Sequence, residues 1–374
     1  MKNAERLIMS RKSQNPIIKH LIGSGLSIPE LRALSPLEEN AQRLVDKAVV
    51  KVGLERLIVA ADVLGKGLIY PVPDPLSVME IQWEQISKTG GAQRTMAPDA
   101  RGENQLPDRK ILQLPVYLTT DDFSINIRTL KMSERIGTPL DTTLVEDATR
   151  RVNESIEDAL INGAGDVQVT KGPPHTGSMT VPGLINAPNV NKFKFGSSLT
   201  SGTTVITRLE PPDTIKSATN GAGTSWADSS INGGSILADV INGITVLQTN
   251  RKFGPYHLYV GTTIGNKLQN DYATTGVTVT PGKTIMQRLE EVDAGNGAKL
   301  VVKVADRIPA DTAILVQMTN DTVEMIDGQA PTVIPWTSAS GFVMFWLVLA
   351  IMIPRVRDDY DQNSGVLVFS LTGA

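Results

Sequence analysis

The chain has 374 residues and a formal net charge of −3, with 36 basic and 39 acidic side chains. A chain of this length is expected to fold into roughly two to three domains, and its balanced charge gives no general attraction to nucleic acid. It contains no cysteine, which excludes disulfides, thiolate chemistry and cysteine-ligated zinc.

The first segment, residues 1–34, is basic and lacks the apolar stretch of a secretory signal. Its early basic side chains are Lys2, Arg6, Arg11, Lys12 and Lys19, against the acidic Glu5. We interpret this segment as an arm. It is either simply solvated, or it contacts a polyanion or a neighbouring subunit.

Helix signals begin at Ser35. This residue suits the N-cap position, Pro36 suits the first helical position, and Glu38 completes a capping box. Apolar residues then follow helical spacing through "NAQRLVDKAVV". The stretch "LERLIVAADVLGKG" continues in the same style and is predicted to stop at Gly65. Residues 35–76 are therefore predicted to hold the N-terminal helices.

Residues 77–118 are predicted to form a long two-stranded ribbon. Two strand-like arms, Ser77–Ile86 and Lys110–Leu118, flank a polar middle that contains several glycines and prolines. An isolated hairpin is marginally stable in water, so a ribbon of this length is expected to lie on something else. Its basic residues are Lys88, Arg94, Arg101, Arg109 and Lys110. Acidic residues alternate with them, and this mixture of signs favours subunit contacts over binding to nucleic acid.

The longest predicted helix covers residues 139–162. Thr138 suits its N-cap, Pro139 its first position and Asn162-Gly163 its end, which gives 24 helical positions, or about 36 Å. Its predicted buried stripe consists of Leu140, Leu144, Val145, Ala148, Val152, Ile156, Ala159 and Leu160. The expected ion pairs on the opposite side are Glu146 with Arg150 and Asp147 with Arg151.

A second domain is predicted over residues 163–335. The chain is loop-like after the long helix, and twelve of the eighteen residues from Ser217 to Gly234 are Gly, Ser, Thr or Asn. This composition predicts a flexible insertion at about 187–234. From Ser235, helix and strand signals alternate to about Ile334, which indicates a compact α/β or α+β domain.

The longest apolar run, Phe342 to Ile353, is twelve residues long. As a helix it would reach about 18 Å, too short for a bilayer core of about 30 Å. Its β-branched and aromatic content instead predicts a strand buried on both faces. Residues 336–374 are thus predicted to be return strands. The charged residues after Pro354, namely Arg355, Arg357 and Asp358, are expected at a rim where subunits meet.

No pattern for chemistry stands out. The histidines His20, His175 and His257 lack the paired spacing of a metal or catalytic site. The "TPGKT" stretch lacks the first glycine of a phosphate-binding loop, and "DYDQNSG" lacks the glutamate that closes a calcium loop. We therefore predict no catalytic, cofactor-binding or metal-binding residues.

Three stretches, taken with the order of these features, carry a resemblance to a known family. They are "RLIVAADVLGKGLIYPV" (56–72), "VNESIEDALINGAG" followed by "GLIN" (within 152–186) and "NRKFGPYHLYVGTTIGNKLQNDY" (250–272). Over most of residues 35–374 the chain resembles the major capsid proteins of tailed phages with the Hong Kong 97-type fold, an α+β fold, and especially their encapsulin-like branch.

The resemblance implies a structural protein that assembles with its own copies, as pentamers and hexamers, into a closed icosahedral shell, without catalysis, cofactor or metal. Its implied parts are an N-terminal arm (1–34), N-terminal helices (35–76), an extended loop (77–118), a peripheral domain with a spine helix (119–162, helix 139–162), an axial domain with a flexible insertion (163–335, insertion about 187–234) and return strands of the peripheral domain (336–374). The implied partners are a portal, scaffold or decoration proteins, and double-stranded DNA contacted non-specifically by the arm, with no membrane. The implied location is the virion capsid, after assembly in the host bacterial cytoplasm.

Two alternatives stay open. An encapsulin-like nanocompartment enclosing cargo enzymes would share this architecture, although the extra length around 163–234 favours a phage capsid. A soluble α/β enzyme with a dispersed site is the alternative from another class. Some relatives cross-link subunits through a loop lysine, and Lys88 lies in the corresponding ribbon, but no matching acceptor asparagine is apparent.

Overall fold

The computed structural model describes residues 57–88, 106–126, 128–129, 132, 143–168, 178–187, 189–194, 225–228, 231–272, 282–293, 297–337 and 342–370. These residues belong to two compact units. The first unit holds the described residues within 57–79, 116–183 and 324–355, and the second holds those within 80–115, 184–323 and 356–370. The helices predicted before Leu57, with their capping box, lie outside the described residues.

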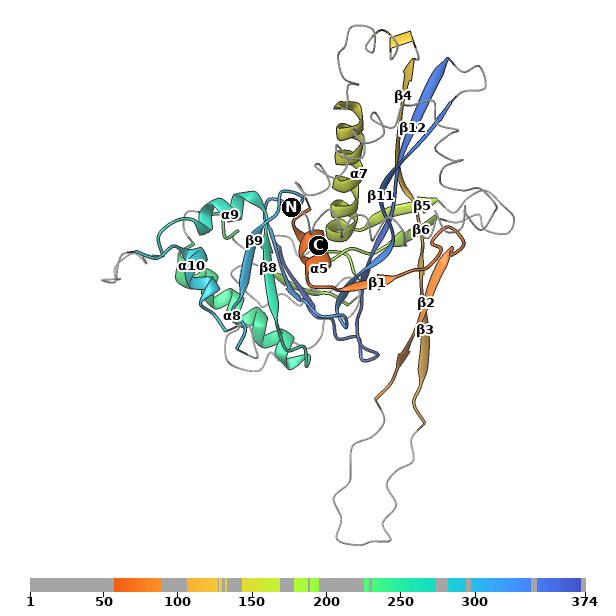
Figure 1. Cartoon of the computed structure of the whole chain (residues 1–374). Coiled ribbons are helices and arrows are strands. Elements are labelled where there is room, and N and C mark those ends of the chain that lie inside the picture. Colours follow the sequence, from red (N-terminus) through yellow and green to blue (C-terminus); the bar gives the residue numbers. More distant parts are fainter. Residues whose placement is uncertain are drawn as a thin grey trace. The chain divides into compact units, whose positions relative to one another are not determined.

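The first unit is built on a four-stranded sheet of order β1-β11-β12-β4 (Figure 1). Its strands are β1 (Ile69–Pro71), β11 (Val323–Thr337), β12 (Val343–Val356) and β4 (Thr119–Asn126). β1 pairs with β11 in parallel, and β12 pairs with β4 antiparallel. The apolar run is therefore a strand, as predicted. Burial alternates from Val343 to Leu347 and is continuous from Val348 to Val356, so only its second half is buried on both faces.

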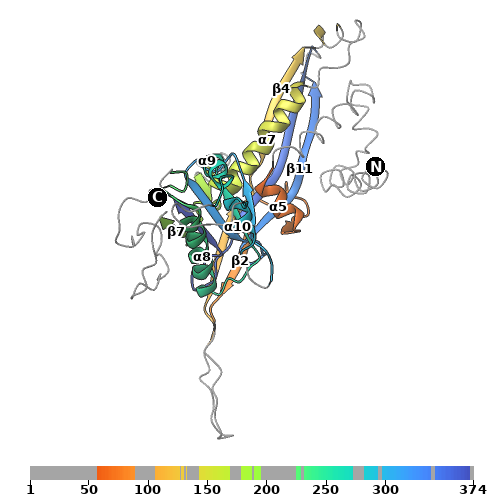
Figure 2. The same ribbon diagram turned by 90° about the vertical axis from the view of Figure 1, so that its left-hand side faces the viewer.

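Helix α7 (Thr143–Asn162) packs along β4 in the first unit, and α5 (Val59–Gly65) packs against α7. Figure 2 shows α7 running beside β4. The predicted stripe is confirmed by the buried residues Val145, Ala148, Val152, Ile156, Ala159 and Leu160. It is wrong at Leu144, which is exposed. The helix start at 138–142, with Leu140, lies outside the described residues.

The charged face of α7 differs from the prediction. Arg150 pairs with Asp147, 3.2 Å away, and Arg151 reaches Asp121 of β4 at 2.9 Å. A neighbouring strand thus offers Arg151 a partner that helical spacing alone does not reveal. The end of the helix is as predicted, because Gly163 has φ +83 and a Cβ there would lie 2.6 Å from the backbone oxygen of Val181.

The residues after α7 are not all loop. β5 (Ala164–Gln168) pairs antiparallel with β6 (Ser178–Val181). Both strands belong to the first unit. The first compact unit continues to Gly183, whereas the second domain was expected from residue 163.

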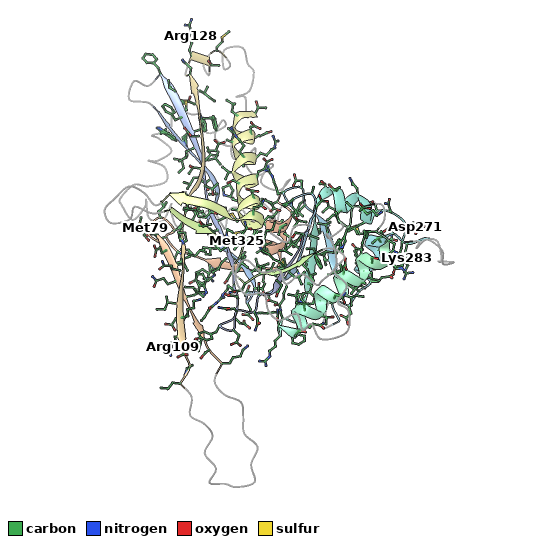
Figure 3. The ribbon with its side chains drawn as sticks, turned by 180° about the vertical axis from the view of Figure 1, so that it is seen from behind. Met79, Arg109, Arg128, Asp271, Lys283 and Met325 are labelled. Atoms are coloured by element: carbon green, nitrogen blue, oxygen red, sulfur yellow. The ribbon has the colours of Figure 1, made fainter. Side chains whose placement is uncertain are left out.

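The second unit contains a five-stranded sheet of order β7-β13-β10-β8-β9. Its strands are β7 (Asn191–Lys194), β13 (Val366–Ser370), β10 (Thr312–Gln317), β8 (Tyr256–Val260) and β9 (Val301–Val304), and its helices are α8 (Gly233–Thr249), α9 (Thr262–Leu268) and α10 (Ile285–Glu290). β8 and β10 are buried at every position, as expected for the centre of a core. Asp271 and Lys283 flank the α9–α10 connection and lie close together in Figure 3. The Tyr272 N–H donates to the Lys283 carbonyl at 3.0 Å.

Two strands join sheets other than those expected. β11 lies almost wholly within the range expected for the second domain, residues 163–335, yet it pairs with β1 in the first unit. β13 was expected among the return strands of the peripheral domain, but it lies between β7 and β10 in the second unit. The local sequence of a strand gives its burial and not its partner, because partners are chosen by residues far away along the chain.

The predicted insertion at about 187–234 also contains ordered structure. β7 falls within it, and so does Trp226, which is fully buried. The Trp226 ring lies 5.0 Å from the Phe369 ring, and its Nε1–H donates to Asp239 at 2.8 Å. One large aromatic side chain therefore anchors part of a segment whose composition predicts flexibility.

Glu157 of α7 caps another helix. Its carboxylate accepts the Val59 N–H at 2.7 Å and the Ala60 N–H at 3.0 Å, while the N-cap residue Ile58 offers no side-chain hydrogen bond. The charge also suits the positive end of the helix dipole.

Glu157→Gln should lower the unfolding free energy by about 2 kcal/mol, because buried hydrogen bonds to a charged acceptor are weakened. Denaturant titration measures this effect. Asp147→Asn, at an exposed site on the same helix, is the matched control and should change stability by less than about 0.5 kcal/mol. Equal effects from both variants would contradict the capping role.

Candidate functional site

The second unit carries a two-stranded antiparallel ribbon, β2 (Glu80–Ile86) with β3 (Arg109–Pro115). Pairing is continuous from Glu80 opposite Pro115 to Ile86 opposite Arg109. One step further, the Ser87 N–H donates to the Asp108 carbonyl at 2.9 Å, and the Asp108 N–H donates to Ser87 Oγ at 2.8 Å. Both predicted arms are thus confirmed as strands, and Figure 3 labels Arg109 at the far end of the described ribbon.

The two faces of the ribbon differ. Residues directly opposite each other in an antiparallel pair share a face. One face is buried near the base, at Ile81 and Leu114, and further along at Gln85. The other face is exposed except at Pro115, at its base, and displays Ile86 and Ile111. Large apolar side chains at these exposed positions are typical of a surface that another protein covers.

The buried face of the ribbon is hydrogen-bonded to a turn of residues 358–361, hereafter the acidic turn. The Gln85 side-chain amide donates to the Asp358 carbonyl at 2.8 Å and to Asp358 Oδ1 at 2.6 Å. Asn189 donates to the other carboxylate oxygen, Oδ2, at 2.5 Å. Both carboxylate oxygens of Asp358 therefore accept hydrogen bonds within the subunit.

Two lysines reach the same turn. Lys88 of the ribbon lies 3.2 Å from Asp361 and 3.7 Å from Asp359. The buried Lys252 lies 2.8 Å from Asp359. A pocket of about 220 Å³ opens between the ribbon base and the turn, with Trp83 and Tyr360 among its lining residues. The arrangement holds the ribbon against its own unit.

The residues predicted for assembly have different surroundings. Lys88 and Asp358 both belong to the contact just described, while Arg109 and Lys110 are exposed on β3. Arg109 lies 3.4 Å from Glu84 across the ribbon. Arg357 is half-buried, and its backbone N–H donates to the Thr322 carbonyl at 2.8 Å. The other two ribbon candidates, Arg94 and Arg101, lie outside the described residues.

Arg355 is not the rim residue that the sequence predicted. It is buried in the first unit, where its Nη2 lies 2.6 Å from Glu324 Oε1 and its Nε donates to the same oxygen at 2.8 Å. Its guanidinium carbon also lies 4.6 Å from the centre of the Tyr70 ring. β12 is buried at every position from Val348 to Val356, so the Arg355 charge lies in the interior and Glu324 compensates it there.

Several residues of the contact have no sequence signal. Gln85 reads as an ordinary strand residue, and Asn189 and Lys252 lie in connecting segments. The acidic residues of the turn are visible as a charged run, but the pairing of Gln85 with Asp358 spans 273 positions. Only the folded chain brings these groups together.

Other candidate motifs have structural roles. His257 is buried, with Nδ1 3.1 Å from the Tyr259 hydroxyl. The last residue of the "TPGKT" stretch, Thr284, is the N-cap of α10, where it forms a capping box with Gln287. Within the described ranges, no group of three His, Cys, Asp or Glu side chains is placed to hold a metal ion. None of the described helices is long and apolar enough to cross a membrane.

The buried Tyr256 and the half-buried Tyr117 predict how stability depends on alkaline pH. Burial raises the pKa of Tyr256 to about 12, and burial raises that of Tyr117 to about 12. Because the folded-state pKa lies above the ordinary value of about 10, stability is intact below that pH and falls as the pH rises towards 12.

Tyr256→Phe should reduce this alkaline loss by up to about 1.4 kcal/mol per pH unit, because one proton no longer distinguishes the folded from the unfolded state. Urea unfolding between about pH 9 and about pH 11.5 measures the slope. An unchanged slope in the variant would show that Tyr256 ionises as easily in the folded chain as in the unfolded one.

A scan against protein-family models and a search of curated protein sequences find no match to this chain. Solved structures do match. A virus-like particle from Pyrococcus furiosus is 14% identical, with 87% of this chain and 98% of that chain covered and a TM-score of 0.54. The capsid of Myoviridae phage XM1 is 11% identical, with 82% and 90% covered and a TM-score of 0.54. A chain of Microbacterium phage Oxtober96 is 10% identical, with 92% and 99% covered and a TM-score of 0.51.

These likenesses extend over most of both chains in each comparison. They show the fold, which is the α+β Hong Kong 97-type fold that the sequence motifs predicted.

Proposed function

We propose that the chain is the major capsid protein of a tailed phage and assembles with copies of itself into a closed icosahedral shell around double-stranded DNA. The observation that carries this proposal is the fold, shared with a phage XM1 capsid over 90% of that chain. A shell subunit needs no catalytic site, and we propose that this chain is not an enzyme.

The ribbon supports assembly on physical grounds. It projects a face with exposed Ile86 and Ile111, and a single hairpin cannot bury such a face by itself. Contact with a neighbouring copy would bury it. A contact of this head-to-tail kind closes into rings when the rotation between copies closes, which is the route to pentamers and hexamers.

The parts implied by the resemblance are assigned as follows. Residues 77–118 are the extended loop, the first compact unit corresponds to the peripheral domain, and most of the second corresponds to the axial domain. The basic arm, 1–34, contacts packaged DNA non-specifically. Further partners are a portal and scaffold or decoration proteins, and the shell is assembled in the bacterial cytoplasm before it becomes the virion capsid.

An encapsulin-like nanocompartment is the second candidate. It is favoured by the likeness to the Pyrococcus furiosus virus-like particle, of which 98% is covered. The two candidates share the shell and differ in what the shell contains.

Negative-stain microscopy and light scattering of the purified chain test the proposal. Closed particles of uniform diameter are expected. If only monomers or dimers are found at high protein concentration, both shell candidates are contradicted. Particles isolated from the native source should contain DNA if the chain is a phage capsid protein, and enzymes if it is a nanocompartment.

A further inference from the structure

We propose that the acidic turn positions the ribbon through two contacts of unequal strength, a fixed one at Gln85 and a releasable, salt-sensitive one at Lys88. The inference deepens the proposed function, because it names residues that set the direction of the extended loop. It rests on that function only for its consequence in assembly, since the contacts lie within one subunit.

The fixed contact is partly buried and charge-assisted. The Gln85 amide nitrogen donates to both the carbonyl and Oδ1 of Asp358, at 2.8 and 2.6 Å, and Gln85 is 9% exposed. Hydrogen bonds to a carboxylate are the stronger kind, and breaking these would leave a buried donor unpaired. Because Gln85 carries no charge, dissolved salt screens this contact little.

The acidic turn is itself held firmly. Lys252 is buried and pairs with Asp359 at 2.8 Å, and the Asp359 N–H donates to the Asn363 carbonyl at 3.1 Å. The Gln362 N–H closes the turn on the Asp359 carbonyl at 2.7 Å. The ribbon is therefore fastened to a fixed support, and movement is confined to the ribbon side of the contact.

The releasable contact is exposed. The Lys88 side chain is 50% exposed and bridges Asp361 and Asp359 at 3.2 and 3.7 Å. Exposed ion pairs of this kind shift a local equilibrium by no more than about five-fold. They weaken as the screening length shrinks from about 8 Å at physiological salt to about 3 Å at 1 M. Lys88 lies beyond Gln85 along the arm. Its release therefore frees the outer end of the described ribbon, here called the outer ribbon and marked by Leu106, while the paired base from Glu80 to Ile86 stays bonded.

Distance measurement between spin labels tests the inference on the full chain. The sequence has no cysteine, so introduced cysteines are labelled uniquely. Leu106→Cys marks the outer ribbon and Phe253→Cys marks the support, both at exposed positions of the second unit. A second pair, Ile111→Cys with Phe253→Cys, reports on the ribbon base, because Ile111 lies opposite Glu84, on the base side of Gln85.

Lys88→Met should broaden the distance distribution of the outer pair about two-fold or more and leave the base pair unchanged. In the chain that keeps Lys88, sodium chloride at about 1 M should broaden the distance distribution of the outer pair to the same extent. In Lys88→Met, the same salt should cause no further broadening. Lys110→Met is the matched control. It removes the same charge from the opposite arm, and among the described residues the lysines paired with the acidic turn are Lys88 and Lys252. Asp358→Ala should broaden the distance distributions of both pairs. If Asp358→Ala does not fold, Gln85→Leu replaces it and should have the same effect.

An unchanged outer distribution in Lys88→Met, or equal broadening in Lys110→Met, overturns the inference. These measurements are made on dilute subunits. They therefore test the Gln85 and Lys88 contacts even if the chain forms no shells and the proposed function fails. Where shells do form, Lys88→Met should slow their assembly about two- to five-fold at low salt relative to Lys110→Met.

Discussion

Replacing residues 89–106 with a short Gly-Asn-Gly-Gly loop is expected to abolish shell assembly and to leave a folded, soluble subunit. The outer ribbon would contact only neighbouring copies in the proposed shell. Its removal takes away a contact repeated around every ring, so the loss is multiplied over the whole particle. Light scattering and negative-stain microscopy should show no closed particles at concentrations where the unaltered chain assembles.

The subunit should survive this change because the base of the ribbon keeps its interactions. The pairing from Glu80 to Ile86 remains, as do the Ser87–Asp108 hydrogen bonds and the contact between Gln85 and Asp358. A change confined to the outer ribbon should shift the melting temperature by less than about 2 °C. Loss of the folded state in the shortened chain would instead place the ribbon in the subunit core.

Two further variants separate the length of the ribbon from its side chains. One replaces 89–106 with a Gly/Ser segment of equal length, and the other carries Arg94→Gln and Arg101→Gln. If side-chain contacts drive assembly, the Gly/Ser variant fails as the shortened chain does. If the two arginines supply those contacts, the second variant also fails, and its assembly should be less sensitive to salt than that of the unaltered chain. If the shortened chain still forms closed shells, the outer ribbon is not needed for assembly.

Local patterns predicted the elements whose burial repeats along the chain. The stripe through Ala148, Val152 and Ile156 has a helical period, and α7 follows it. The apolar run at Phe342–Ile353 has the composition of a strand, and β12 contains nearly all of it. Both features arise from neighbours in the sequence, so they can be read without knowing the fold.

The distribution of strands between sheets could not be predicted in the same way. β13 and β12 are consecutive in the sequence, yet they belong to different sheets. The short segment between them contains the acidic turn. The change of sheet depends on partners such as Val366 opposite Val316, fifty positions away. No periodicity in either strand records that choice.

The candidate site shows the same limit for side chains. The amino-acid sequence shows the charged residues Arg355 and Asp358, and both were expected at a subunit rim. In the structure each has its own internal partner, Glu324 and Gln85 respectively. A charge in a sequence predicts that a partner or solvent is needed, and it does not say which of the two the fold supplies.

The pair of Arg355 and Glu324 leads to the largest expected loss of stability from a single substitution. Both side chains are nearly inaccessible, with exposures of 4% and 6%, and they lie 2.6 Å apart at the closest approach. Arg355→Met should lower the unfolding free energy by about 3–5 kcal/mol, because the Glu324 carboxylate would stay buried without this guanidinium. Denaturant titration, followed by a probe in the first unit, measures the loss.

The double variant Arg355→Met with Glu324→Leu separates two free energies. One is the net stabilisation by the ion pair, and the other is the cost of removing only one of its partners. Apolar replacement of both partners removes the buried charge altogether, so stability should recover to within about 1–2 kcal/mol of the unaltered chain. Arg109→Met provides the exposed counterpart, since Arg109 and Glu84 are 64% and 49% exposed, and it should cost less than about 1 kcal/mol. If Arg355→Met costs no more than Arg109→Met, solvent reaches Glu324 in the folded chain. The end of β12 would then be open to water, and Arg355 would again be available to a neighbouring subunit.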